Sequence, residues 1–522
     1  MAQTVNIDAM IPRADFRDVD DHESSASKKI SDISLSQLTP DSFLVPSLRK
    51  PDFQRETTQW TPDQIVKFLE SFLDDELVPS VILWKSKTYY FVIDGAHRMS
   101  ALLAWINDDY GDGVMSKNLY GDDISEEQKR IATRLRNKVR STVGSFADMK
   151  KVMLDSSKAG TDARLLARAA SAKTRSIDLQ WVEGDAEKAE ASFFNINKQG
   201  TPLHATEERL LRNRDKPIAI ASRSIARAGA GHKYWSSFEE TVQQEIEEKS
   251  REVHGLLFSP ELSFPIKTLN LPHGGQSSPL TAYNLLMDFL AFSIVGHDRK
   301  DETKNLYQSD QDGSATIEAL NSCIRVLKRM TSNESKSLGL HPAVFFYSER
   351  GRHLDTVFLG FAAAIAKAVR NNDSSYFKKF TANRELIEKV FVDHKFLLYQ
   401  ANSLFGSKQR VTRWQAFFEK IVAPGAIKES FRQSELLVLL DLKDKVIAES
   451  ANESGKAFTS ATKSAIFLQK SLDSATRCPE CGGRVHVEKA IQYDHIKGKA
   501  TGGMGTVENG QITHPFCNSI KN

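Results

Sequence analysis

The last 45 residues of the chain carry two pairs of side chains of the kind that bind zinc. Cys478 and Cys481 are separated by two residues, and His514 and Cys517 repeat this spacing farther along. A two-residue spacing lets a tight turn aim both ligands at one ion, and Zn²⁺ favours four such ligands in a tetrahedron. So short a tail has little apolar core, so a bound ion would constrain its fold more than any other feature. A purely structural zinc module is the simplest interpretation.

The segment between the two pairs carries a second group of polar residues. Asp494 and His495 end an apolar, strand-like run at Ile491–Ile496, a glycine-rich loop follows, and Asn518 comes directly after the last zinc ligand. A carboxylate and an amide can hold a hard cation, while an imidazole can take a proton from water. Two strands followed by a helix would bring these three side chains together. The pattern therefore predicts a metal site that hydrolyses phosphodiesters.

The order of these motifs resembles the HNH nuclease module, the ββα-metal fold. The shared text is CxxC, then DHI, a Gly-Gly loop, an Asn, and a second zinc pair followed by Asn, over about Arg477–Asn522. The resemblance implies that His495 is the general base and that Asp494 and Asn518 hold the catalytic divalent metal. It also implies that Asn509 braces the loop that orients His495.

The resemblance also implies two different kinds of metal site. Structural zinc would be held by Cys478, Cys481, His514 and Cys517. His514 stands where many members of the family have cysteine, and zinc accepts either ligand. The catalytic site, with oxygen and nitrogen ligands, would be weaker and would suit Mg²⁺, Mn²⁺ or Ni²⁺.

Three polar clusters punctuate the first part of the chain. The middle cluster, Asp94–Arg98 (DGAHR), lies between the strand-like run Tyr89–Ile93 and a predicted helix. The outer two are Gln54-Arg55 and the run Phe194–Asn197 with Gly200. A glycine at a strand-to-helix turn presents backbone amides, and both helix N-termini and guanidinium groups favour phosphates. The DGAHR motif is equally compatible with an internal ion pair between Asp94 and Arg98 that caps the helix.

Taken in order, the three clusters resemble the ParB/sulfiredoxin-like domain of GmrSD-type restriction systems, over roughly Ile30–Arg212. Members of that family bind and hydrolyse nucleoside triphosphates, and the hydrolysis is coupled to DNA restriction. The implied nucleotide pocket is lined by Gln54, Arg55, Asp94, Gly95, His97, Arg98 and Asn197. Ala96-His97 replaces the usual two glutamines, so binding is a firmer expectation than hydrolysis. The DGQHR-type domain of DNA-phosphorothioation regulators is a neighbouring alternative.

The sequence predicts an α+β multidomain protein in four parts. Residues 1–30 read as a flexible leader, and 31–212 as the ParB/sulfiredoxin-like α/β domain with a partly helical insert at about 107–173. Residues 213–455 read as an all-α middle domain, and 456–522 as the HNH module.

Apolar spacing and turn residues predict particular elements. In the first domain they predict a helix at Thr61–Leu73, with Thr61 as N-cap and Pro62 as the first helical residue. The other predicted elements are strands at Ser80–Trp84 and Tyr89–Ile93, and helices at Arg98–Ile106, Ala315–Arg329, Leu354–Ala368, Arg384–Ala401 and Ser434–Ala448.

Charge and hydropathy narrow the class of protein. The formal net charge is only +3, so a nucleic-acid surface must come from local clustering of cations. One such cluster, Lys129–Arg140, reads first as a solvated helix face and second as a phosphate contact. The N-terminus lacks a signal core, and no apolar stretch reaches the ~20 residues that span a bilayer. We therefore expect a cytoplasmic protein.

The leading interpretation is a nucleotide-regulated, divalent-metal-dependent HNH DNA endonuclease of prokaryotic defence against foreign or modified phage DNA. The alternative is a non-catalytic DNA-binding regulator or scaffold with a structural zinc module and a vestigial nucleotide pocket. DNA and a nucleoside triphosphate are the expected partners, and a homo-oligomer is compatible with the sequence. The amino-acid sequence does not specify the DNA modification that is recognised or the nucleotide that is preferred.

Overall fold

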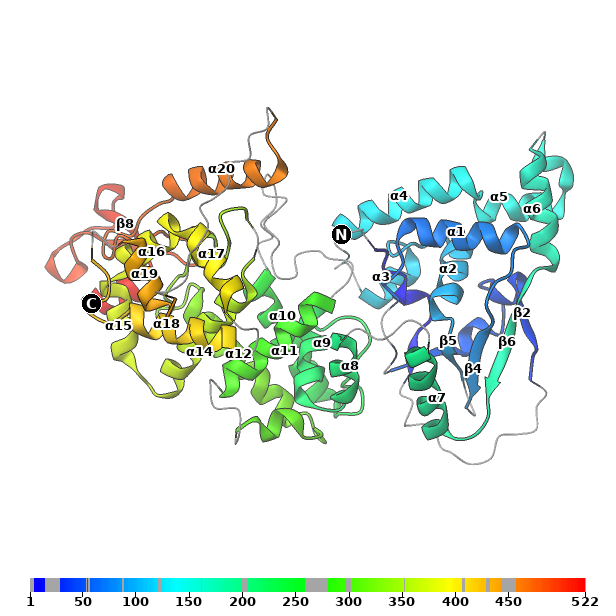
Figure 1. Ribbon diagram of the computed structural model, residues 1–522, viewed down its shortest axis with the longest axis horizontal. Coiled ribbons are helices and arrows are strands. Elements are labelled where there is room, and N and C mark those ends of the chain that lie inside the picture. The colour runs from blue at the N-terminus through cyan, green and yellow to red at the C-terminus, as the bar shows by residue number, and fades with distance from the viewer. Residues whose placement is uncertain are drawn as a thin grey trace. The chain divides into compact units, whose positions relative to one another are not determined.

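The computed structural model groups the chain into two compact units (Figure 1). It describes residues 4–14, 29–52, 54, 57–86, 89–120, 124, 126–160, 162–199, 205–258, 280–295, 302–351, 353–405, 409–428, 432–442 and 457–521. The first unit holds Met1–Arg214, Ala230–Tyr234 and Gly275–Thr281, and the second holds Asp215–Gly229, Trp235–Gly274 and Ala282–Asn522. The predicted division of the chain into four parts stays a prediction.

A six-stranded mixed sheet organises the first unit, in the order β1-β3-β5-β4-β6-β2. The pairs β4/β5 and β2/β6 are antiparallel, and the other neighbours are parallel. The strands are β1 Arg13–Ala14, β2 Asp32–Ser34, β3 Leu48–Pro51, β4 Val81–Lys85, β5 Tyr90–Asp94 and β6 Ser176–Val182. The two strands predicted from the sequence thus form β4 and β5, each shifted by one residue.

Helices cover both faces of this sheet (Figure 1). Val81, Leu83 and Val92 pack with α1 and α2, while Trp84 and Phe91 point to the other face and pack with α7. This alternation follows from the two-residue period of a strand. The helices are α1 Pro62–Leu73, α2 Ala96–Asn107, α3 Val114–Tyr120, α4 Glu126–Thr142, α5 Phe146–Leu154, α6 Ala163–Thr174, α7 Ala186–Gln199 and α8 Ala205–Arg212.

Helix α1 begins as its sequence predicts. The Thr61 hydroxyl accepts a hydrogen bond from the Gln64 amide at 3.3 Å, the Gln64 side chain accepts from the Thr61 amide, and Pro62 is the first residue. This reciprocal arrangement satisfies two backbone donors that the first turn leaves open. The predicted insert is helical as well: α3 to α6 lie within it, and Leu135 and Met149 are buried in the main core.

The start of the chain differs from the expected leader. Val5, Ile7 and Met10 are fully buried, and the amide of Val5 donates to the Trp60 carbonyl at 2.9 Å. Strand β1 pairs with β3, so residues 4–14 belong to the core of the first unit. The polar average of residues 1–30 hides the apolar residues that this short segment buries. Residues 15–28 lie outside the described part of the chain.

The described residues of the second unit before the C-terminal module form helices, as predicted. The predicted helix Ala315–Arg329 lies within α12, and Leu354–Ala368 matches α14 except that Leu354 is its N-cap. The predicted helix Arg384–Ala401 is broken at His394. Residues 443–448 of the last predicted helix lie outside the described residues. The helices are α9 Pro217–Ala226, α10 Glu240–Phe258, α11 Leu280–Val295, α12 Ser314–Met330, α13 Pro342–Phe345, α14 Asp355–Arg370, α15 Ser374–Ala382, α16 Arg384–Asp393, α17 Lys395–Leu404, α18 Arg410–Ile421, α19 Gln433–Leu439 and α20 Ser460–Asp473.

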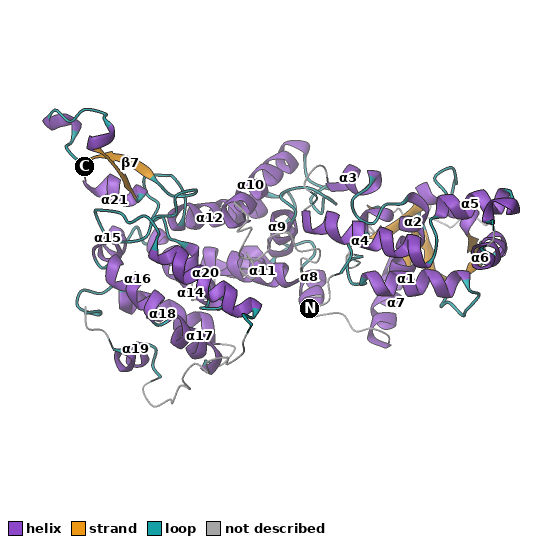
Figure 2. Cartoon of the chain, turned by 90° about the horizontal axis from the view of Figure 1, so that it is seen from above, coloured by secondary structure: helices purple, strands orange, loops and turns teal. Residues whose placement is uncertain are grey.

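The second unit ends in a hairpin followed by a helix. Strands β7 (Gln492–His495) and β8 (Gly510–Thr513) are antiparallel, with Asp494 opposite Gln511, and α21 (Pro515–Lys521) follows at once. Figure 2 shows β7 beside α21. The predicted order of strand, strand and helix is therefore present.

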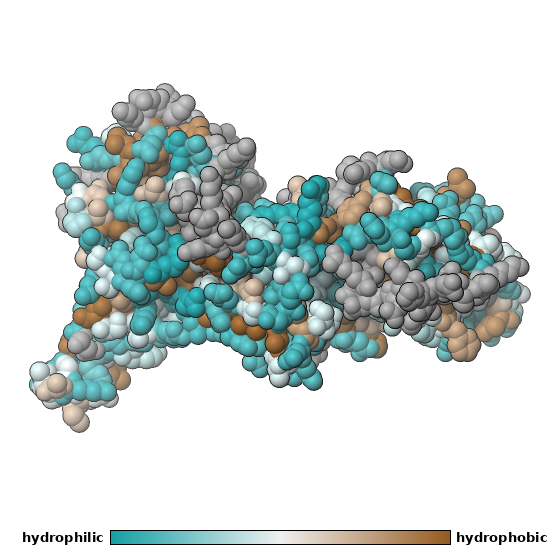
Figure 3. Space-filling model, turned by 90° about the horizontal axis from the view of Figure 1, so that it is seen from below, coloured by the Kyte–Doolittle hydropathy of each residue, from teal (hydrophilic) through white to brown (hydrophobic). Residues whose placement is uncertain are grey.

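Hydrophilic residues cover most of the face drawn in Figure 3, and hydrophobic residues form separate patches on it. Among the described residues, no helix has both the length and the apolar character needed to cross a bilayer. The architecture as a whole is mixed α/β, and the likeness of the first unit to a ParB/sulfiredoxin fold stays a prediction.

Candidate metal centre and nuclease site

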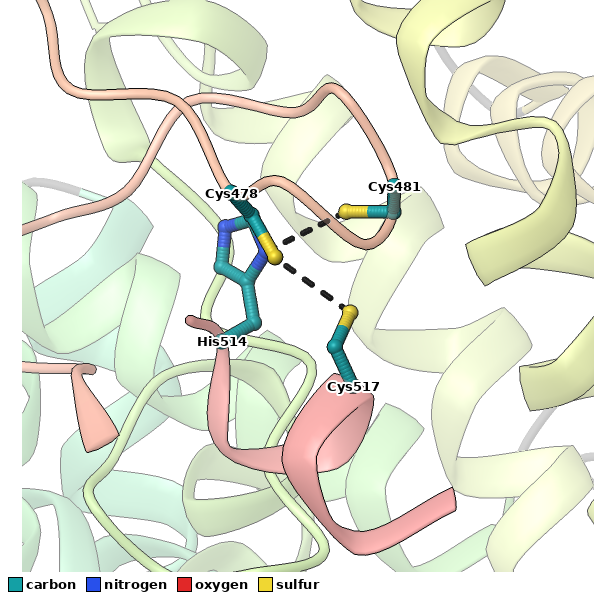
Figure 4. A group of neighbouring side chains, drawn as sticks. All are labelled: Cys478, Cys481, His514 and Cys517. Carbon is teal, nitrogen blue, oxygen red and sulfur yellow. Dashed lines mark hydrogen bonds between the residues drawn. The ribbon is translucent and has the colours of Figure 1, made fainter. Parts of the chain in front are cut away.

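The four predicted zinc ligands converge on one point (Figure 4). Their ligand atoms all lie within 4.8 Å of one another, and three of the four side chains are buried. Cys478 and Cys481 come from a turn closed by the Gly482 amide, which donates to the Cys478 carbonyl at 2.9 Å. His514 and Cys517 come from the start of α21. Three thiols and an imidazole in this arrangement can hold a zinc ion.

Hydrogen bonds within and around the cluster also prepare its four side chains to bind a metal ion. His514 Nε2 lies 3.0 Å from the Arg484 carbonyl, while its Nδ1 faces the sulfur of Cys481 at 3.3 Å. A hydrogen bond to the distal ring nitrogen orients a metal-binding histidine and fixes its tautomer. Hydrogen bonds from Cys481 and Cys517 lower the pKa of the Cys478 thiol. Zinc binds thiolates, so the cluster has the chemistry that the ion requires.

Helix α16 fastens this zinc turn to the helical part of the second unit. The buried Arg384 guanidinium donates from Nε to Glu388 at 2.8 Å and from Nη2 to the Gly339 carbonyl at 2.8 Å. Glu388 is fully buried and accepts from the backbone amide of Arg484 at 2.8 Å. At Gly482, where φ is +68°, a Cβ would approach the Glu385 carboxylate to 2.6 Å. The turn and α16 therefore fit too closely for a larger residue.

The predicted catalytic residues lie on the hairpin and on α21. The Asp494 carboxylate is almost buried and accepts hydrogen bonds at 2.8 Å from the His495 amide, the Gln511 side chain and the Lys521 ammonium. Burial opposes ionisation, yet the hydrogen bonds from Lys521 and Gln511 hold the pKa of Asp494 below its usual range. Asp494 is therefore an ionised carboxylate, the kind of oxygen group that a hard divalent cation prefers.

Asn518 and Asn509 take up different positions around this site. Asn518, on α21, donates from its side chain to the Gln492 side chain on β7 at 2.9 Å. Asn509 pairs with the backbone of Lys497 through bonds of 2.7 Å and 3.1 Å, and it also donates to the Met504 carbonyl. These bonds close the glycine-rich loop beside half-buried His495. The loop comes so near that a Cβ at Gly505 would lie 4.0 Å from His495 Nε2.

The first unit brings part of the predicted nucleotide pocket together at the end of β5. Gly95 adopts φ +93° as the residue before α2, and a Cβ there would approach Val81 to 2.7 Å, so glycine is required. Arg98 donates to Asp94 at 2.9 Å and to the Ser80 carbonyl at 2.9 Å. The internal ion pair considered from the sequence is thus formed.

Other members of the predicted pocket lie nearby. Gln54 donates from its amide to the Ile93 carbonyl at 3.3 Å, and His97 stacks on Trp60 with ring centroids 5.6 Å apart. Among the described residues, the buried atoms without a hydrogen-bond partner include Gln54 Oε1, Thr58 Oγ1, Arg98 Nε and Ser100 Oγ. Buried polar atoms are normally satisfied, so these four atoms have hydrogen-bonding capacity left over.

Two predicted pocket residues are not placed by these contacts. Arg55 lies outside the described residues. Asn197 lies on α7, whose bounds are Ala186–Gln199, and its side chain is outside what the structure describes. The Phe194–Asn197 run is thus helical rather than part of a loop.

Two family models match the chain in separate segments. Residues 35–214 match the N-terminal domain of GmrSD restriction endonucleases, and residues 478–522 match HNH endonucleases. Their order is that of a GmrSD-type fusion. No curated protein and no solved structure matches the chain. The two matches support a DNA nuclease of a restriction system, and HNH nucleases use divalent metals.

Several residues of the HNH segment were not found by sequence reasoning. Two of them, Gln511 and Lys521, contact both Asp494 and Glu480. Arg384 and Glu388 support the zinc turn from outside the matched segment. Gln511 is identified by its register opposite Asp494, which depends on how the glycine-rich loop closes. Arg384 and Glu388 read as an ordinary surface pair at i, i+4 spacing, so no local signal marks them as buried.

Proposed function

We propose that this chain is a divalent-metal-dependent HNH endonuclease that cuts foreign or modified DNA, and that a nucleotide bound by the GmrSD-type domain regulates cutting. The observation that carries the nuclease is the placement of ionised Asp494 next to His495 on a hairpin that α21 faces. This arrangement offers a cation ligand and a proton acceptor within two consecutive residues.

Each residue of the HNH site would have its own part in the hydrolysis of the phosphodiester. Asp494, joined by Asn518 from α21, would hold the cation, which neutralises charge that develops on the phosphate during hydrolysis. His495 would take the proton from the attacking water, because a neutral imidazole nitrogen can accept a proton. Asn509 keeps the loop closed beside His495 through its bonds to Lys497 and Met504. The zinc cluster, fastened to α16, holds the hairpin and the helix together.

The regulatory half of the proposal rests on the GmrSD-type domain. Gln54, Asp94, Gly95, His97 and Arg98 would bind the nucleotide, together with Arg55 and Asn197. The unpartnered Arg98 Nε and Gln54 Oε1 support a polar ligand there. Whether the pocket hydrolyses the nucleotide is a separate question, because Ala96 supplies no side-chain donor.

Plasmid cleavage separates the proposal from the scaffold alternative. The purified full chain, loaded with zinc, is incubated with unmodified, glucosylated and phosphorothioated DNA. Each DNA is tested with Mg²⁺ or Mn²⁺, and with and without nucleoside triphosphates. We expect metal-dependent nicking or cutting of at least one DNA, altered by nucleotide. Intact supercoiled DNA under every condition would support the non-catalytic scaffold instead.

A further inference from the structure

The side chain of Lys521 lies against the carboxylate of Asp494, the proposed ligand of the catalytic cation. Its ammonium lies 2.8 Å from Asp494 Oδ2, 2.9 Å from Glu480 Oε1 and 3.4 Å from the His495 carbonyl. Lys521 belongs to α21, three residues after Asn518, so one helix supplies both a proposed cation ligand and this ammonium.

The acceptor sites of the Asp494 carboxylate are largely taken. Oδ1 accepts from the His495 amide, and Oδ2 accepts from both Gln511 and Lys521. A divalent cation at Oδ2 would share one oxygen with an ammonium, and like charges a few ångströms apart repel even near a protein surface. A metal cation at Oδ2 and the Lys521 ammonium would therefore compete for the same oxygen.

Glu480 offers the ammonium a second partner. It lies between zinc ligands Cys478 and Cys481, and its carboxylate also accepts from Gln511. A small rotation of the lysine side chain could keep the bond to Glu480 while releasing Asp494, because the long lysine stem is flexible.

We propose that Lys521 is an internal competitor of the catalytic cation: its ammonium binds both Asp494 and Glu480 when no metal is bound, and it keeps only Glu480 when the cation binds. The inference rests on the proposed function, since it assumes that Asp494 is a metal ligand. Lys521 is a positioning residue in this account, because it acts through the Asp494 carboxylate. Its effect is on the affinity for the cation, which can be measured without DNA cleavage.

The test is calorimetric titration of Mn²⁺ into the zinc-loaded full chain. Lys521→Met removes the charge and keeps most of the side-chain length, and we expect it to bind Mn²⁺ about two- to fivefold more tightly, the range of an exposed ion pair. Lys521→Arg keeps the charge and should bind Mn²⁺ as the parent does. Lys499→Met removes the same charge from an exposed lysine of the same module and should change the affinity little.

The outcomes separate this inference from the proposed function. Equal or weaker Mn²⁺ binding by Lys521→Met, with zinc content unchanged, would overturn the competition. An equal gain in Lys499→Met would also overturn it, because the effect would then be one of net charge alone. Asp494→Asn should lose the Mn²⁺ site in both the parent and the Lys521→Met background. If Asp494→Asn still bound Mn²⁺ normally, the assigned ligand of the proposed function would be wrong instead.

Discussion

At the scale of single residues, the buried charges of the second unit explain why the zinc turn has a defined position. Arg384 and Glu388 are 1% and 0% exposed; Arg384 donates to the Gly339 carbonyl, and Glu388 accepts from the Arg484 amide next to the zinc turn. A buried ion pair adds little net stability by itself, but removal of one partner leaves a charge with no compensation. The pair therefore acts as a constraint on the position of the turn.

Glu388→Ala should lower the free energy of unfolding of the second unit by about 3–5 kcal/mol, because it leaves the Arg384 guanidinium buried without its carboxylate. The matched control is Glu245→Ala, which breaks an exposed i, i+4 pair with Lys249 on α10 and should cost less than about 1 kcal/mol. Denaturant unfolding followed by far-UV circular dichroism measures both. Equal, small losses would show that Glu388 has no special structural role.

A second buried cluster governs the acid stability of the first unit. Asp8 accepts from Lys50 at 2.5 Å and from Arg13 at 2.9 Å, and the Asp8 and Lys50 side chains are almost fully buried. Burial alone would raise the pKa of Asp8, but Arg13 and Lys50 together hold it well below its usual range. A carboxyl group whose pKa is lowered on folding stabilises the fold above its unfolded pKa of about 3.9.

Asp8→Asn should destabilise the first unit by about 3–5 kcal/mol at neutral pH, because two buried cations lose their counter-charge. The difference from the parent should shrink as the pH falls below about 4, where the parent progressively loses the contribution of Asp8. Unfolding curves of both proteins between pH 7 and pH 2 provide the measurement. A difference that stays constant across this range would contradict the role of the Asp8 carboxylate.

Among the helices and strands, the sequence correctly predicted those whose position is set by residues close by in the chain. Thr61 and Pro62 marked the start of α1, and the apolar run before Asp494 became β7. Elements that depend on distant partners were missed. Residues 4–14 lie in a polar stretch at the start of the sequence, yet they pair with β3 and with the Trp60 backbone. No proline or glycine in the sequence of α16 and α17 predicts the break at His394 between them.

The candidate site shows the same division between local and distant information. The four zinc ligands could be found from two-residue spacing, because a tight turn fixes the geometry locally. Gln511 and Lys521 could not, since their contact with Asp494 depends on hairpin register and on the packing of α21. Gln511 and Lys521 can therefore be identified only from the folded structure.

The zinc turn is an element whose stability should depend on its ion. The double variant Cys478→Ser, Cys517→Ser should contain no zinc, whereas the parent should contain one zinc per chain by metal analysis. Loss of zinc should unfold the hairpin and α21, because the buried apolar cluster around these cysteines is very small. Cys323→Ser, a buried cysteine of α12 outside the cluster, is the control that should keep its zinc. Stoichiometric zinc in the double variant would contradict the assignment.

At the scale of the whole molecule, the proposed regulation requires that a nucleotide at one end of the sequence affects cleavage at the other. A nucleotide can do so only if it binds the resting and active arrangements with different affinities. The GmrSD-type domain would provide the binding site, and the helical part of the second unit is fastened to the HNH segment through Arg384 and Glu388.

Arg98→Ala tests this coupling. Loss of one charge-assisted phosphate contact costs about 1.5–3 kcal/mol, so nucleotide binding should weaken at least about tenfold. The same preparation should show an altered rate of DNA cleavage, with a sign that tells whether nucleotide activates or restrains the nuclease. Arg212→Ala, which removes an exposed arginine paired with Glu208, should leave both unchanged. Parent-like binding and cleavage in Arg98→Ala would contradict both the pocket and the coupling.

In the proposed mechanism, His495 performs the proton transfer of a metal-dependent cut in DNA. The direct test compares parent, His495→Ala and His394→Ala proteins of equal zinc content on the most susceptible DNA, in the presence of Mg²⁺ or Mn²⁺. His394 is a half-buried histidine between α16 and α17 and controls for the loss of an imidazole. We expect His394→Ala to cut like the parent, and His495→Ala to lose cleavage by at least about a hundredfold while it still binds the DNA. Cleavage by His495→Ala at the parental rate would contradict the account.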